Sequence, residues 1–264
     1  MLNEGYSPFN LNKPNPLEDI DFNTVCYFDT ETTGLLPSVA QIIEIAAVRG
    51  KEQFYKKIEL TEETKQLIAQ QAQRFERKNE RDKTIDELLQ MTNYYDEKAK
   101  TNSSEEQALK EFKEFAEQSS FLLAHNAEYD MKMVNVRMKK YGIQTIKNVP
   151  VLDSLAFSRR FFIPLLRSQE EEGSQEAKAL LDQLTTKYTK SNERKTVVSN
   201  LGTLSKALFG QIENWHQALA DVLTTKKIVE QIFSSLMIKH KEDTTKPSFK
   251  RYYMKNKRME NRFR

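Results

Sequence analysis

Four carboxylates and one histidine, spread over three segments of the sequence, are the residues best suited to chemistry. In chain order they are Asp29, Glu31, Asp130, His216 and Asp221. Asp29 and Glu31 lie two residues apart after an apolar run at 25–28, and side chains at positions i and i+2 of an extended chain point to the same side. These two carboxylates are therefore expected to converge on one divalent cation. Hard oxygen ligands of this kind favour Mg²⁺ or Mn²⁺.

Each segment by itself also has an ordinary structural explanation. Acids are common in turns at strand ends, and Asp130 falls in the first turn of an expected helix, where a negative charge stabilises the helix N-terminus. His216 and Asp221 are five residues apart, about 140° in projection around an α-helix. They share a site only if His216 lies at the loose start of the helix or just before it. Taken together, the three segments indicate a metal site with a general base.

The elements that must position these residues alternate between strands and helices. Strands are expected at 25–28, 42–48, 53–60, 121–124 and 149–152, and the first one opens onto Asp29. Helices are expected within 62–90, at 105–116, 128–142, 153–161 and 200–208, and from 215 onward. A meander of three strands followed by alternating helices and strands favours an α/β or α+β domain with a mixed sheet.

One domain is expected at 22–238, after a flexible leader at 1–21 and before a basic tail at 239–264. Two polar, charge-rich stretches near 62–90 and 168–196 are interpreted as insertions within that domain. The tail holds 10 Lys or Arg against 3 Asp or Glu, so it carries +7 while the rest of the chain carries −4. A slightly acidic body is thus joined to a strongly basic end.

Four aromatic residues are interleaved with the Lys and Arg residues of the tail. These aromatic residues are Phe249, Tyr252, Tyr253 and Phe263. Because cations attract phosphates and aromatic rings stack on bases, this composition suits single-stranded nucleic acid. A solvated tail, or a docking peptide for a protein partner, is the alternative interpretation.

The composition excludes several other classes. A single cysteine, Cys26, rules out a disulfide framework and favours a reducing compartment, so the cytoplasm (of a host, if a virus or phage encodes the chain) is the expected location. With only three histidines, a zinc site of Cys and His ligands is not expected. The N-terminal segment lacks the apolar core of a signal peptide, and no run of about 18 apolar residues suggests a membrane span.

Three sequence segments resemble the three motifs of the DEDDh, DnaQ-like 3′–5′ exonucleases. They are FDTETTG at Phe28–Gly34, HNAEYD at His125–Asp130 and HQALAD at His216–Asp221. The likeness continues in QIIEIAAV, VLDSLAFSRR and NLGTLSKALFG, and it covers roughly residues 22–237. It implies the ribonuclease H-like fold, in which helices flank a central mixed five-stranded sheet, here with helical insertions.

The resemblance also implies roles for the site residues, with two Mg²⁺ or Mn²⁺ ions as cofactors. Asp29 would bridge both ions, and Glu31 and Asp221 would help to hold the ion next to the attacking water. Asp130 would be the fourth metal residue and would support the site through metal-bound water. His216 would take the proton from the attacking water as the general base. The expected substrate contacts are Thr32, Thr33, Gly34, His125 and Asn126.

Several alternatives stay open at this point. The partner is expected to be the 3′ end of single-stranded DNA or RNA, with DNA preferred, and an RNA exonuclease of the ribonuclease T or oligoribonuclease type is the alternative. The chain could also be an accessory subunit that mainly binds a DNA polymerase. Some relatives are dimers, so a homodimer is kept as an alternative, and no membrane partner is expected.

Overall fold

The structure is a computed structural model of the whole chain, and it describes residues 21–74, 84–96, 101–186, 196–210 and 217–230. Except for Asp21, the leader expected at 1–21 lies outside them, as does the whole of the basic tail expected at 239–264. Residues Asn23–Lys226 form one compact unit.

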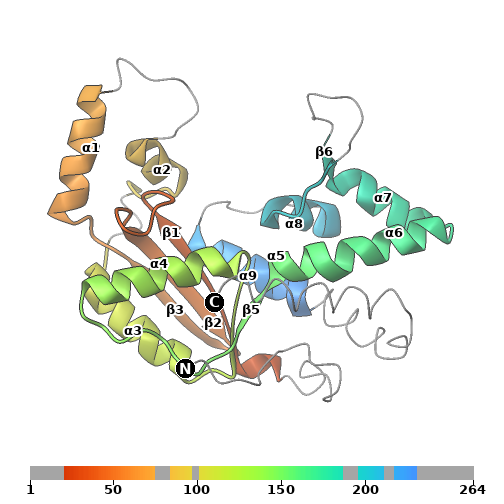
Figure 1. Cartoon of the computed structure of the whole chain (residues 1–264), viewed down its shortest axis with the longest axis horizontal. Coiled ribbons are helices and arrows are strands. Elements are labelled where there is room, and N and C mark those ends of the chain that lie inside the picture. Colours follow the sequence, from red (N-terminus) through yellow and green to blue (C-terminus); the bar gives the residue numbers. More distant parts are fainter. Residues whose placement is uncertain (1–20, 75–83, 97–100, 187–195, 211–216, 231–264) are drawn as a thin grey trace, which may run out of the picture. The chain divides into compact units, whose positions relative to one another are not determined.

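A mixed five-stranded sheet with the order β3-β2-β1-β4-β5 forms the centre of this unit (Figure 1). After one 3₁₀ turn, η1 (Phe22–Thr24), the strands are β1 (Val25–Thr32), β2 (Ile42–Arg49), β3 (Glu52–Lys57), β4 (Phe121–Ala124) and β5 (Val151–Asp153). β1, β2 and β3 form an antiparallel meander, while β4 runs parallel to β1 and β5 runs parallel to β4. The expected mixed α/β sheet and its five strands are confirmed.

β1 is longer than the sequence indicates, because it continues through Asp29 and Glu31 to Thr32. The expectation that Asp29 follows the end of this strand is therefore wrong. Pairing with β2, in which Asp29 lies opposite Ala46 and Glu31 opposite Glu44, keeps the acidic segment extended. Tertiary pairing of this kind overrides the weak strand propensity of acidic residues.

Two helices, α3 (Glu105–Glu117) and α4 (Ala127–Lys140), pack against the sheet and enclose the main core. Phe28 of β1 and Phe112 of α3 meet with ring centroids 5.5 Å apart, and Met133 and Val134 of α4 belong to the same cluster. Figure 1 shows both helices lying across the strands. The side chain of Ser104 caps the start of α3 by accepting a hydrogen bond from the backbone N–H of Gln107.

The first expected insertion, near 62–90, contributes two helices, α1 (Glu62–Arg74) and α2 (Ile85–Met91), within the described residues. A capping box formed by Thr84 and Glu87 starts α2. Ile85 and Leu89 of α2 pack with Ile43 in a second, smaller core cluster. Ile43 is the extra residue of a bulge in β2, since Glu31 pairs with Glu44 and Thr32 with Ile42.

The chain after β5 is mostly helical. Its elements are α5 (Ser154–Phe157), the π-helical turn η3 (Ser158–Phe162), α6 (Ile163–Glu171), α7 (Gln175–Leu184), β6 (Thr185–Thr186), β7 (Thr196–Val197), α8 (Leu201–Phe209) and α9 (Ala218–Ile228). The second expected insertion, near 168–196, thus includes the end of α6, all of α7 and a two-stranded pairing. α9 was expected from about Trp215, which lies outside the described residues, and it is described from Ala218 onward.

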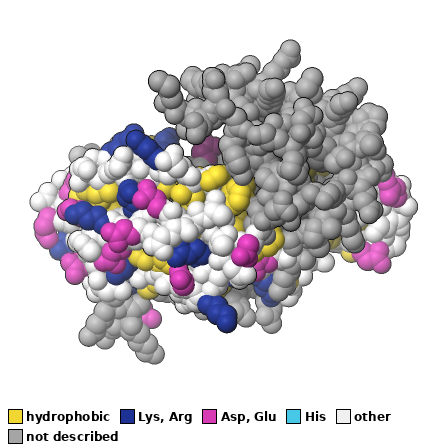
Figure 2. Space-filling model, turned by 90° about the horizontal axis from the view of Figure 1, so that it is seen from below, with side chains coloured by type: hydrophobic (Ala, Val, Ile, Leu, Met, Phe, Trp, Pro, Cys, Tyr) yellow, Lys and Arg dark blue, Asp and Glu magenta, His cyan; other side chains and the backbone are white. Residues whose placement is uncertain are grey.

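Positive and negative side chains alternate on the described part of the face drawn in Figure 2, where Lys and Arg are interspersed with Asp and Glu. Short-range ion pairs such as Lys110–Glu106 and Lys113–Glu117 along α3 show the same mixture. Among the described residues, no helix combines the length and the apolar character that crossing a membrane requires.

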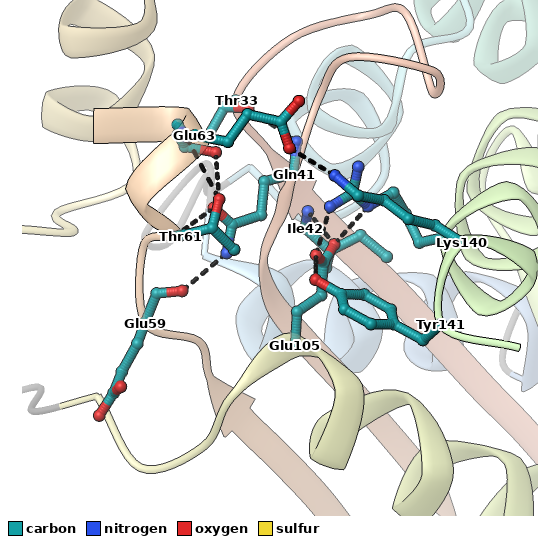
Figure 3. Close-up of polar contacts among 11 residues, drawn as sticks. Thr33, Gln41, Ile42, Glu59, Thr61, Glu63, Glu105, Lys140 and Tyr141 are labelled. Carbon is teal, nitrogen blue, oxygen red and sulfur yellow. Dashed lines mark hydrogen bonds and ion pairs between the residues drawn. The ribbon is translucent and has the colours of Figure 1, made fainter. Parts of the chain in front are cut away.

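Glu105 of α3 and Arg137 of α4 form a buried ion pair, and Glu105 also binds the backbone of β2, so that it joins the three elements (Figure 3). Glu105, at the first position of α3, accepts hydrogen bonds from the backbone N–H of Ile42 at 3.0 Å, from Nε of Arg137 at 2.7 Å and from the hydroxyl of Tyr141 at 2.8 Å. Glu105 and Arg137 are both 2% exposed. Removing one charge of such a pair leaves the other buried without its partner, which is strongly destabilising.

We expect Arg137→Ala to lower the free energy of unfolding by about 3–5 kcal/mol, because the carboxylate of Glu105 then stays buried without a cation. Urea denaturation followed by circular dichroism measures this loss. Lys110→Ala, which removes the exposed pair with Glu106, is the matched control and should cost less than about 1 kcal/mol. Equal losses in the two variants would contradict the role given to the buried pair.

Candidate active site

Three carboxylates from two distant segments converge at one place. One oxygen each of Asp29, Glu31 and Asp221 can be chosen so that all lie within 4.8 Å of one another. Ligand oxygens around an octahedral Mg²⁺, at about 2.1 Å from the ion, are about 3–4.2 Å apart. The three carboxylates therefore need only a small adjustment to hold one such cation, and their oxygen-only chemistry fits Mg²⁺ or Mn²⁺.

The pleat of β1 and the first turn of α9 explain this convergence. Asp29 and Glu31 share one face of β1, whereas Phe28 and Thr30 point to the other, as alternate residues of a strand do. Asp221 lies in the first turn of α9, and its backbone N–H donates to the carbonyl of Gln217. Lys226, further along α9, lies over the ring of Tyr27 on β1, with its Nζ 5.1 Å from the ring centroid.

Asp130 reaches the same region from α4, on the opposite side of β1. Its Oδ1 accepts hydrogen bonds from both the hydroxyl of Thr30, at 2.6 Å, and the backbone N–H of Thr30, at 3.2 Å. β4 pairs with β1 only at Val25–Tyr27, so the carboxylate takes the place of a strand partner for Thr30. Asp130 thus fixes the segment between Asp29 and Glu31 and lies outside the three-carboxylate group.

Burial and mutual repulsion make the site unfavourable for negative charge while no cation is present. Desolvation, and then the neighbouring carboxylates, raise the pKa of Asp29 well above its usual range and that of Glu31 to about 8. Burial also raises the pKa of Asp130 to about 7, against the opposing effect of its hydrogen bonds from Thr30. A divalent cation would relieve this repulsion.

Hydrogen bonds anchor the expected substrate-contact segment Thr32–Gly34, which begins at the last residue of β1 and continues into the loop. The hydroxyl of Thr32 lies 2.8 Å from the hydroxyl of Tyr129, and both hydroxyls are 2.9 Å from the carbonyl oxygen of Gly34. Thr33 exchanges two hydrogen bonds of 2.9 Å with the backbone of Gln41.

Gln41 extends this anchoring to the segment that leads into α1 (Figure 3). Its amide nitrogen donates to the carbonyl of Glu59 at 2.7 Å, and its amide oxygen accepts from the backbone N–H of Thr61 at 3.0 Å. Gln41 itself is fully buried. The segment of Thr32 and Thr33, at the end of β1 and the start of the loop, is therefore held by hydrogen bonds to Tyr129 and Gln41.

His125 and Asn126, the other expected substrate contacts, lie between β4 and α4. Nε2 of His125 donates to the carbonyl of Ser199 at 2.9 Å, so Nδ1 accepts from the hydroxyl of Ser154, also at 2.9 Å. Burial lowers the pKa of His125 to about 4, so the ring is neutral near pH 7. Asn126 is exposed, has φ +79° and makes no capping hydrogen bond through its side chain.

His216, the expected general base, lies outside the described residues, two positions before the first residue of α9. The structure therefore brings together Asp29, Glu31 and Asp221, and places Asp130 beside them. It also shows a fifth acid that the sequence analysis missed, because Glu44 of β2 lies opposite Glu31 and is only 3% exposed. A lone acid within the apolar run of β2 was the signal that could have revealed it.

The known proteins that this chain matches include exonucleases and DNA polymerases. Residues 26–229 match the exonuclease family model, RNase_T. A DNA polymerase III PolC-type from Halalkalibacterium halodurans is 33% identical over 154 residues, and one from Staphylococcus haemolyticus is 31% identical over 142 residues. The matched regions cover 58% and 53% of this chain but only 9% of each polymerase.

Solved structures with the same fold include E. coli Exonuclease I in complex with a dA16 oligonucleotide, with a TM-score of 0.52 and 14% identity. The match covers 80% of this chain and 42% of that one. The complex of the same enzyme with a dT13 oligonucleotide gives a TM-score of 0.50, again at 14% identity, over 81% of this chain and 43% of the other.

The metal-free protein should lose stability as the pH rises. The pKa values of Glu31 and Asp130 in the folded chain, about 8 and about 7, exceed the ordinary carboxyl values of 4.5 and 3.8. Between about pH 4 and 8 the folded state then binds more protons than the unfolded state, so the free energy of unfolding falls with rising pH. In EDTA we expect a lower Tm at pH 8 than at pH 6.

Added Mg²⁺ should raise the Tm more at pH 8 than at pH 6, because the cation binds the deprotonated carboxylates. Scanning calorimetry at both pH values, with EDTA or Mg²⁺, measures the effect. The variant Glu31→Gln, which removes one of the raised groups, should flatten the pH dependence in EDTA. A Tm that rises between pH 6 and pH 8 in EDTA would contradict the electrostatic description.

Proposed function

Because this chain belongs to the exonuclease family, in its DEDDh, DnaQ-like branch with the ribonuclease H-like fold, we propose that it removes nucleotides one at a time from the 3′ ends of DNA. The observation that carries this proposal is the convergence of Asp29, Glu31 and Asp221. A binding module needs no such cluster, and bringing three partly buried acids together is costly unless they hold a cation.

Hydrolysis at a 3′ end breaks the bond between phosphorus and the 3′ oxygen of the preceding nucleotide. An attacking water supplies the new oxygen, and the products are a nucleoside 5′-monophosphate and a chain that ends in a 3′ hydroxyl. Two Mg²⁺ or Mn²⁺ ions, when bound, would supply a more acidic water and would stabilise the charge of the leaving oxygen. Asp29, Glu31 and Asp221 would hold them.

The remaining site residues have supporting roles in this proposal. Asp130 keeps β1 in place through Thr30, so that Asp29 and Glu31 face the reacting phosphate. His216 accepts the proton of the attacking water as the general base. In the sequence, His216 stands two residues before Ala218, where the description of α9 begins.

The loop after β1 is proposed to bind the terminal nucleotide through Thr32, Thr33 and Gly34. A Cβ at Gly34 would meet only Cβ of Ala40, at 3.8 Å, and the backbone there is not left-handed. Within the described chain, neither strain nor crowding requires glycine at this position. A bare backbone would instead allow close approach of a sugar or base. His125 and Asn126 are proposed as further contacts of the substrate.

DNA is the proposed substrate because the relatives that resemble this chain in sequence are DNA polymerases of the PolC type. The chain spans less than a tenth of those relatives, so we propose association with a polymerase as a separate hypothesis. The basic tail at 239–264 is proposed to bind single-stranded nucleic acid. The cytoplasmic location, favoured by the single cysteine, and the homodimer stay predictions.

We expect the wild-type protein to shorten 5′-labelled single-stranded DNA from its 3′ end in Mg²⁺ or Mn²⁺, and to be inactive in EDTA. Asp29→Ala, Glu31→Ala and Asp221→Ala should abolish cleavage, because each removes a ligand of the cations. His216→Ala should lower kcat by at least about 100-fold, as loss of a general base does. Gel analysis of the labelled products measures these rates.

Lys110→Ala is the control, because Lys110 lies on the exposed surface of α3 and should leave the rate unchanged. RNA of the same sequence, tested in parallel, shows whether DNA is the preferred substrate. Near-normal turnover in Asp29→Ala would remove that residue from the site. The absence of metal-dependent cleavage of either nucleic acid by the wild type would refute the proposed activity.

A further inference from the structure

Glu44 is a buried acid for which the proposed reaction provides no role. It lies in the middle of β2, between Ile43 and Ile45, and is 3% exposed. In the antiparallel pair it stands directly opposite Glu31, so two like charges face one another. Such a pair is destabilising in a sheet. A carboxylate is expected to persist at such a place only if it makes a contact that an apolar residue cannot make.

That contact is with the start of α9. Oε2 of Glu44 accepts a hydrogen bond of 3.3 Å from the backbone N–H of Ala218, the first residue of the helix. The first N–H groups of a helix have no partner within it, and a carboxylate at that end satisfies one of them and interacts favourably with the helix dipole. Ala218 precedes Asp221 by three residues, less than one turn.

Residues of β3 hold Glu44 in this position from the other side. Tyr55 lies beside its carboxylate, and burial together with that carboxylate raises the pKa of the Tyr55 hydroxyl. Lys57 lies opposite Glu44 in the pairing of β2 with β3, and it adds a nearby positive charge. Nζ of Lys57 itself donates to the carbonyl of Asn93 at 3.2 Å and lies over the ring of Tyr94, 5.1 Å from its centroid. Glu44 is thus fixed between β3 and α9.

We propose that Glu44 is a positioning residue that anchors the first turn of α9 to β2 and so keeps the carboxylate of Asp221 beside those of Asp29 and Glu31. The proposal rests on the function proposed above, since it assigns Glu44 to the same metal site. β1 carries two of the three carboxylates and is fixed by the sheet. The third comes from a different segment, and Glu44 connects that segment to the strand next to β1.

Two substitutions separate anchoring from direct metal binding. Glu44→Gln keeps an amide oxygen that accepts the N–H of Ala218, whereas Glu44→Ala removes the acceptor. Glu105→Gln is the matched control, because Glu105 is an equally buried glutamate that accepts a backbone N–H, but from Ile42 and without contact to α9. It therefore reports any general effect of lowered stability.

Two measurements on the whole, nucleic-acid-free protein test the proposal. Hydrogen exchange followed by NMR should show the amide of Ala218 exchanging several-fold faster in Glu44→Ala, and nearly unchanged in Glu44→Gln and Glu105→Gln. Calorimetric titration with Mn²⁺ should show about 10- to 100-fold weaker binding in Glu44→Ala, as expected when a residue that orients a ligand is lost. Glu44→Gln should retain most of the affinity, and Glu105→Gln should bind like the wild type.

Unchanged exchange at Ala218 in Glu44→Ala would overturn the proposal. Equal loss of Mn²⁺ affinity in Glu44→Gln and Glu44→Ala would overturn it in favour of direct metal binding by Glu44. A loss of Mn²⁺ affinity in Glu105→Gln as large as that in Glu44→Ala would overturn it in favour of general destabilisation. A wild type that binds Mn²⁺ but cleaves no DNA would refute the proposed activity and leave the anchoring intact. If the wild type bound no Mn²⁺, the metal site would be wrong, and the exchange rates would still test the anchor.

Discussion

The repulsion among partly buried carboxylates is the constraint on which the rest of the site depends. One carboxylate oxygen each of Asp29, Glu31 and Asp221 lies within 4.8 Å of the other two. Burial and the neighbouring carboxylates raise the pKa values of Asp29 and Glu31. Such a cluster separates unless the backbone holds each member in place. The sheet holds the two residues of β1, the bond between Asp130 and Thr30 reinforces that strand, and Glu44 reaches the start of α9.

This constraint explains why several polar residues are buried around the site. Gln41 links the loop after β1 to the segment before α1, and Glu105 links the start of β2 to α3 and α4. The contacts of Gln41 fix the segment that follows Glu31, whereas those of Glu105 hold the sheet to its covering helices and do not reach α9. Rigid support of this kind is what a catalytic arrangement needs, because small displacements of a ligand or base reduce the rate greatly.

The sequence was sufficient to predict the sheet, its flanking helices and the three carboxylates that converge, which are Asp29, Glu31 and Asp221. Strong apolar runs, such as Ile42–Val48 and Phe121–Ala124, marked the strands, and the three motifs marked the acids. It did not predict that β1 continues through Glu31, since that depends on pairing with β2. Nor could spacing show that Asp130 binds Thr30 or that Glu44 reaches Ala218, since these contacts join residues 100 and 174 positions apart.

The central claim is that Asp29, Glu31 and Asp221 together hold a divalent cation. Crystals of the wild-type protein grown with Mn²⁺, and measured at a wavelength where manganese scatters anomalously, test it most directly. We predict an anomalous peak bounded by oxygens of these three carboxylates, and no peak at that place in Asp29→Ala. Manganese bound only elsewhere, or no manganese between these carboxylates at saturating concentration, would contradict the account.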